Sequence, residues 1–176
     1  MSRARLGARE RPPFEGVVLV GVGNPLRRDD GVGPAVAAAV GDDLEAGGAR
    51  VLEVGQLLPE LVEELVGARR VVVVDASSAL PPGAVRVERL GPGPSPATGA
   101  PLSHGCSLEE LLALCAALYG VTPAVSLVSV GAGSFEIGAG LSPVVQAAFA
   151  AACQAALDGA RDVVGDPPGR EVACGA

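Results

Sequence analysis

Four side chains that could bind a metal ion or move a proton stand out in the sequence. Asp29 and Asp30 follow a glycine-rich turn, Asp75 comes directly after four consecutive valines, and His104 is the single histidine of the chain. Two carboxylates and one imidazole suit a borderline divalent ion such as Zn²⁺ or Ni²⁺, with positions left open for a substrate. We therefore interpret Asp30, Asp75 and His104 as candidate metal ligands.

Each of these residues also has an ordinary structural explanation. Asp29 or Asp30 could cap the helix expected over residues 31–40, where a carboxylate complements the helix dipole. Asp75 could cap the next turn, although a bare carboxylate after four valines is costly unless it is paired or metal-bound. His104 could be an incidental loop histidine. Residue types alone leave both interpretations open.

The glycine turn raises the question of a nucleotide cofactor, because Gly21-Val-Gly23 follows a predicted strand. Leu26 stands where the dinucleotide fingerprint has its third glycine, and the two acids after it would repel a phosphate. The residues therefore favour a tight strand-to-helix turn that needs glycine at positive φ. We expect no organic cofactor, and a nucleotide-binding α/β domain remains the weaker alternative.

The elements that must position these residues alternate between strand and helix. Apolar or β-branched runs predict strands over residues 16–21, 51–54, 71–75, 84–90 and 124–130. Proline and capping signals predict helices over residues 31–40, 59–66, 108–118 and 143 to about 157. This order predicts a single three-layer α/β/α domain with a mainly parallel twisted sheet. We expect that domain to span residues 16–158, between a flexible extension at 1–15 and a disordered tail at 159–176.

In such sheets ligands bind beyond the carboxyl ends of the strands. Asp30 and Asp75 follow two of the predicted strands, and a glycine-rich loop that carries Glu136 follows a third. His104 precedes the helix that a Ser107–Glu110 capping box is expected to open. All of these residues could therefore face one rim of the sheet.

Bulk composition restricts the class of protein. The 176 residues are 49% apolar and 2% aromatic, which fits an aliphatic core. A net charge of −7 argues against nucleic-acid binding. The four cysteines form no CxxC pair, so we expect a reduced, cytoplasmic chain. The arginine-rich start has no apolar core of a signal peptide, and no apolar run is long enough to span a membrane.

The motifs resemble those of the hydrogenase maturation endopeptidases, which trim the large subunit of nickel–iron hydrogenases. Residues 21–33 are similar to the family's opening GxGNxLxxD(E/D)xxG signature, and the four valines before Asp75 resemble its central strand and acid. Leu102-Ser-His104 resembles its histidine segment, and residues 128–143 resemble its closing strand, loop and helix. The matching order extends from residue 17 to residue 157. Many members have Glu where this chain has Asp30, but a carboxylate is retained.

The resemblance implies that Asp30, Asp75 and His104 are the catalytic, metal-reading residues of an endopeptidase. Its metal would be nickel already inserted in the large-subunit precursor, for which zinc or cadmium could substitute in vitro, and its product would be the precursor without its C-terminal extension. Ser103 and Cys106 flank His104, but no Ser–His–Asp or Cys–His arrangement is evident, so metal-assisted hydrolysis is our hypothesis for the mechanism. The supporting loop would consist of Gly21, Gly23, Asn24, Asp29 and Gly31.

Two further questions stay open at the level of the sequence. A metal-sensing chaperone that docks on a hydrogenase subunit without cutting it would use the same three residues. The chain could be a monomer or a weak homodimer. We expect neither nucleic acid nor membrane among its partners.

Overall fold

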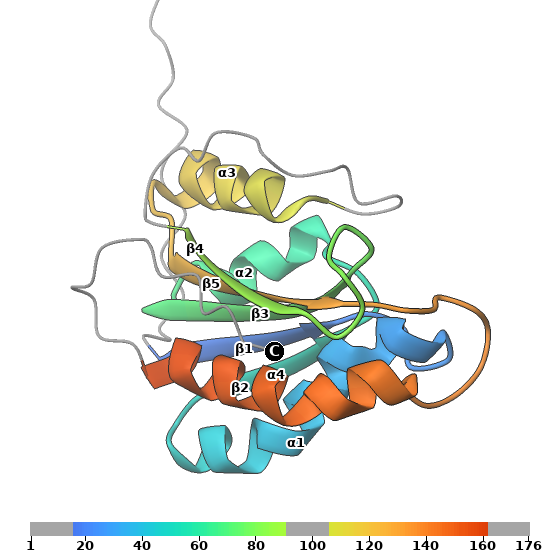
Figure 1. The fold of residues 1–176 in the computed structure, drawn as a ribbon. Helices are drawn as coiled ribbons and strands as arrows, with labels where there is room; N and C mark the ends of the chain where they lie inside the picture. Colours follow the sequence, from blue (N-terminus) through green and yellow to red (C-terminus); the bar gives the residue numbers. More distant parts are fainter. Residues whose placement is uncertain (1–15, 91–105, 162–176) are drawn as a thin grey trace, which may run out of the picture.

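A five-stranded sheet with helices on both faces forms the centre of the molecule in the computed structural model, which describes residues 16–90 and 106–161 (Figure 1). The strands are β1 (Val17–Val22), β2 (Arg50–Val54), β3 (Arg70–Ser77), β4 (Val85–Leu90) and β5 (Ala124–Gly131). The α-helices are α1 (Val32–Ala46), α2 (Val62–Leu65), α3 (Leu108–Tyr119) and α4 (Pro143–Arg161), and two 3₁₀ helices are η1 (Arg28–Gly31) and η2 (Pro59–Leu61).

The order of the strands across the sheet is β2-β1-β3-β5-β4. Every neighbouring pair is parallel except the last, in which β4 runs antiparallel to β5 at the edge. The prediction of a mainly parallel sheet in an α/β domain is therefore confirmed. Strand β4 runs against the others because only residues 78–84 separate it from β3, whereas a parallel strand needs a longer crossover connection.

The valines of β3 show how the sheet is covered. Val71 and Val73 face a core that includes residues of α2 and α3, whereas Val72 and Val74 face a core that includes residues of α1 and α4. Figure 1 shows these two helix pairs on opposite faces of the sheet. A strand buried on both faces has no polar side to alternate with, which explains the unbroken run of valines.

The strand order reverses between β1 and β3. The chain passes from β1 through α1 to β2 on one side, and β3 then pairs with β1 on the other side. In open α/β sheets a crevice forms at such a reversal, beyond the carboxyl ends of the two strands. The residues that follow β1 and those that end β3 are therefore the ones this fold places at a binding crevice.

Four elements differ by more than one residue from those that the sequence predicted. The helix expected over residues 31–40 extends to Ala46, and neither Asp29 nor Asp30 caps it, because both lie in η1 and the N-cap is Gly31 with no side-chain cap. Strand β3 continues past Asp75 to Ser77, since it pairs with β5 over its whole length. The expected helix 59–66 divides into η2 and α2, and α4 extends to Arg161.

Helix α3 begins where its capping signal predicted. Ser107 Oγ accepts a hydrogen bond from the main chain of Glu110 at 3.1 Å, and the Glu110 carboxylate accepts one from the Ser107 main chain at 2.7 Å. This reciprocal pair satisfies two N–H groups that a helix terminus leaves unpaired. Among the described residues, none of the helices is both long and apolar enough to span a membrane.

Candidate functional site

Asp30 and Asp75 reach the same rim of the sheet from different elements. Asp30 lies in η1, directly before α1, and Asp75 lies near the end of β3. Both are partly buried, and they are close enough for the charge of Asp30 to act on Asp75. The structure thus brings together two of the three predicted ligands, at the reversal of strand order.

The ionisation of Asp75 reflects this position. Burial raises the pKa of its carboxyl from 3.8 to about 7, and the charge of Asp30 adds to the rise. A hydrogen bond of 2.8 Å from the main chain of Ala76 to Asp75 Oδ1 opposes the shift without cancelling it. A partly buried carboxylate that faces a second carboxylate is stabilised in its ionised form by a cation.

The turn between β1 and η1 holds Asp30 in place. The main-chain N–H of Asn24 donates to Asp30 Oδ2 at 2.9 Å, and the Asn24 side chain accepts from the N–H of Leu26 at 2.9 Å. Gly23 has a φ of +131°, and a Cβ there would lie 1.8 Å from the carbonyl oxygen of Asp30. The prediction of a positive φ is confirmed at Gly23, and Asn24 forms the side-chain turn that shapes the loop.

Gly21 and Gly31 are required for close packing rather than for a positive φ. A Cβ on Gly21 would lie 2.4 Å from the carbonyl oxygen of Gly33 in α1, and one on Gly31 would lie 2.8 Å from Cα of Pro25. The start of α1 therefore packs directly on the end of β1. This close contact determines how far η1 lies from the sheet, and therefore where Asp30 lies.

Asp29 has a different role from its neighbour. It is fully buried, and its carboxylate accepts hydrogen bonds from the main chains of Gly133, Ser134 and Ser142 and from the Ser142 hydroxyl, at 2.6 to 3.0 Å. Burial alone would raise the pKa of Asp29, but these four bonds outweigh it and hold the pKa below 3.8. Asp29 thus fixes the loop between β5 and α4. This role of Asp29 was not predicted from the sequence.

Main-chain pairing joins the same two loops. Arg28 N–H donates to the carbonyl of Gly138 at 2.9 Å, and Gly138 N–H donates to that of Leu26 at 2.9 Å. Arg28 takes a positive φ of 51°, which is uncommon for a residue with a side chain. Glu136, which the sequence placed on this loop, is exposed. Figure 1 shows the two loops side by side at one end of the sheet.

His104, the third predicted ligand, lies outside the described residues. Within the described ranges 16–90 and 106–161, no three His, Cys, Asp or Glu side chains gather into a metal-binding group. The chain re-enters the described part at Cys106, whose N–H donates to the carbonyl of Leu57 at 3.1 Å. Burial, with a contribution from Glu110, raises the pKa of the Cys106 thiol, which disfavours a thiolate nucleophile at this position.

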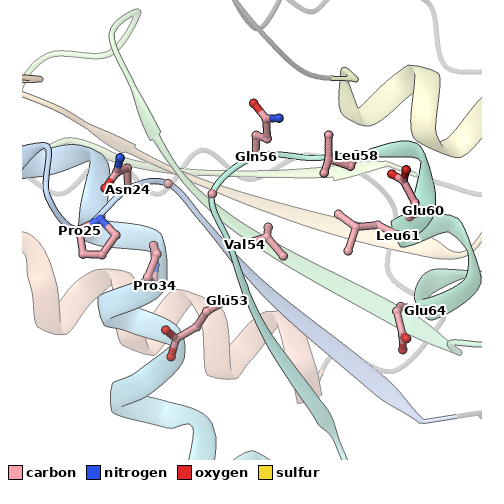
Figure 2. A pocket seen from close by; sticks show the side chains of 12 residues that line it. Asn24, Pro25, Pro34, Glu53, Val54, Gln56, Leu58, Glu60, Leu61 and Glu64 are labelled. Atoms are coloured by element: carbon pink, nitrogen blue, oxygen red, sulfur yellow. The ribbon is translucent and has the colours of Figure 1, made fainter.

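A groove of about 860 Å³ begins at the turn that holds Asp30 (Figure 2). Asn24 and Pro25 lie at one end, Leu58 and Glu60 lie at the other, and Val54 lies between them. The N–H of Gly23 donates to the carbonyl of Val54 at 2.9 Å, so the turn and the end of β2 form one continuous wall. This groove could not be predicted from the sequence, because its lining comes from β2, η2, α2, the start of α1 and the glycine turn.

Comparisons with solved structures agree with this architecture. HybD, the hydrogenase maturating endopeptidase from E. coli, is 23% identical, with 83% of this chain and 92% of that chain covered and a TM-score of 0.68. The [NiFe] hydrogenase maturation protease HybD from Thermococcus kodakarensis is 26% identical over 81% of this chain and 97% of that chain, with a TM-score of 0.64. HycI from Thermococcus kodakarensis KOD1 is 19% identical over 84% and 93%, with a TM-score of 0.66. No match was found among curated protein sequences.

The fold is an α/β domain in which Asp30 and Asp75 lie at the reversal of strand order, near enough for the charge of one to act on the other. The family model described as HycI, hydrogenase maturation protease, matches residues 40–159, which is more than half of the chain. The chain belongs to the hydrogenase maturation protease family and is therefore a peptidase. The matched range includes Asp75 and His104 and begins after Asp30.

Proposed function

We propose that this chain is the endopeptidase that removes the C-terminal extension of a nickel–iron hydrogenase large-subunit precursor after nickel insertion. Family membership supports a maturation protease. The solved structures named above are hydrogenase maturation proteases, and two of them are [NiFe] hydrogenase maturation proteases. The precursor is the partner that this assignment requires.

Recognition of a metal on the precursor is supported by one observation, the proximity of Asp30 to Asp75. Their charges repel, and both lie at the rim where this fold binds ligands. A divalent ion exposed on the precursor would neutralise the pair, and two carboxylates would leave further coordination positions for the precursor's own ligands. Nickel is in this view part of the substrate, and zinc or cadmium could replace it in vitro.

We assign the third ligand position to His104. An imidazole beside two carboxylates suits Ni²⁺ better than carboxylates alone, since imidazole is a preferred ligand of nickel. With the ion held by these three side chains, it would polarise the scissile carbonyl or a water molecule. The residues of this chain would orient the precursor and hold the ion close to the cleaved bond.

Incubation of the chain with a nickel-loaded precursor tests the proposal. A protease shortens the precursor, so its gel mobility increases and mass spectrometry finds a new C-terminus. A metal-sensing chaperone would bind the same precursor and leave its mass unchanged, and that result would contradict the proposal. Replacement of Asp75 by Asn, or of His104 by Ala, should abolish processing, whereas the exposed Asp42→Asn should not.

A further inference from the structure

The groove of Figure 2 adjoins the turn that holds Asp30. It begins at Asn24, whose main-chain N–H holds the carboxylate of Asp30, and it continues past Val54 to Leu58 and Leu61. Asp30 itself does not line the groove, but the turn that positions it does. Continuity with the candidate site distinguishes this groove from an isolated surface hollow.

The lining of the groove is apolar along its length and acidic at both ends. Leu58 is 42% exposed although it is a large apolar side chain, and Val54 and Leu61 are half-buried beside it. Glu53 lies at the end of the groove near Pro34, and Glu60 lies at the end near Leu58 (Figure 2). Both carboxylates are exposed, whereas Glu64 is paired with Arg50.

We propose that this groove binds an extended segment of the precursor, adjoining the cleaved bond, that carries apolar side chains and at least one Lys or Arg. The proposal rests on the function proposed above and adds the residues that select the segment. Leu58 supplies apolar contact, and the carboxylates of Glu53 and Glu60 attract a basic side chain, because charges at the rim of an interface favour a partner of opposite sign. The overall charge of −7 acts in the same direction.

Steady-state cleavage of nickel-loaded precursor by groove variants tests this assignment. We expect Leu58→Ser to raise KM about tenfold with kcat unchanged, because a buried leucine contact is removed from binding alone. The matched control is Val87→Ser on the edge strand β4, where the side chain is 41% exposed and outside the groove. Thermal unfolding of each variant checks that the fold is intact.

The contribution of Glu53 and Glu60 can be tested through the salt dependence of KM. We expect the double variant Glu53→Gln and Glu60→Gln to raise KM roughly three- to tenfold at low salt, and the difference from wild type to disappear near 1 M salt, where charges are screened within about 3 Å. Glu45→Gln, which changes an exposed carboxylate at the far end of α1, should leave KM unchanged at every salt concentration.

Two outcomes would overturn the assignment. One is a wild-type enzyme that cleaves the precursor while Leu58→Ser and the double variant keep its KM. The other is a Leu58→Ser variant that changes the sedimentation from dimer to monomer without affecting KM, which would make the groove a contact between two copies of this chain. A wild-type chain that does not cleave at all would instead contradict the proposed function.

Discussion

Asp29 holds Ser142 by two hydrogen bonds, from the Ser142 main-chain N–H at 2.6 Å and from its hydroxyl at 2.8 Å, across 113 positions of sequence. This contact ties the 3₁₀ turn after β1 to the loop before α4. The adjacent Asp30 accepts a bond from Asn24 within its own turn and faces the rim. The two neighbouring acids therefore differ in role: Asp29 fixes the loops, whereas Asp30 is free of that task and is the one that we propose binds the metal.

We predict that Asp29→Asn destabilises the protein by about 2–4 kcal/mol at pH 7, since a buried carboxylate with four hydrogen bonds is replaced by an amide that cannot accept them all. Because the pKa of Asp29 is lowered by folding, its stabilising effect is present above pH 3.8 and is lost as the pH falls further. Urea unfolding at pH 7 measures the change.

Asp30→Asn is the matched control for that prediction, because Asp30 is only partly buried. Its effect on unfolding should stay below about 1 kcal/mol. Hydrogen exchange should show faster exchange of the Gly133, Ser134 and Ser142 amides in Asp29→Asn but not in Asp30→Asn. Equal destabilisation by the two substitutions would contradict the division of roles.

The pH dependence of stability should reveal Asp75. Its folded pKa of about 7 lies above the usual 3.8, so its carboxyl favours folding only while it is protonated. The stability that it contributes is complete below pH 3.8 and is lost as the pH rises toward 7. In the metal-free protein we predict that Asp75→Asn is more stable than wild type by about 1–3 kcal/mol at pH 8 and equal to it near pH 4.

Denaturant unfolding of both proteins across this pH range measures the difference. Asp42→Asn, at an exposed position of α1, should follow the wild-type curve throughout. If the free energy of unfolding had the same pH dependence in Asp75→Asn and wild type, burial and the charge of Asp30 would not raise the pKa of Asp75, and the prediction would be wrong.

Close packing at the start of α1 gives a third prediction. A Cβ on Gly33 would lie 2.2 Å from the carbonyl oxygen of Val22 and 2.5 Å from that of Val74, and neither main chain can move away easily. Gly33→Ala should therefore cost about 3 kcal/mol or more of stability. In the same helix Gly41 has only ordinary contact with Val51 at 3.7 Å, so Gly41→Ala should stabilise by up to about 1 kcal/mol. Thermal unfolding compares the two, and similar melting temperatures would contradict the packing described.

The sequence predicted those parts of the fold that local pattern determines. The valines before Asp75 indicated a strand buried on both faces, and Ser107 with Glu110 indicated the start of a helix. Asp30 and Asp75 were placed at one rim because each follows a strand of a parallel sheet. These inferences need only neighbouring residues and the general rules of α/β topology.

Contacts between distant segments could not be predicted in this way. Nothing near Asp29 in the sequence points to Ser142, and a capping role was the simpler explanation for the two acids. The raised pKa of Asp75 depends on burial by other elements, and the groove at Leu58 arises only when η2 and the glycine turn lie together. His104 and the two terminal segments lie outside the described residues, so their predicted roles stay predictions.

We propose above all that Asp30 and Asp75 recognise nickel bound to the substrate. The most direct test compares the rates of C-terminal cleavage of nickel-loaded and nickel-free precursor. We expect wild type to cleave only the nickel-loaded form, and Asp75→Asn to reduce that rate on the order of 100-fold or more while the protein remains folded. Cleavage of both precursors at the same rate by wild type, or an unchanged rate with Asp75→Asn, would contradict the claim.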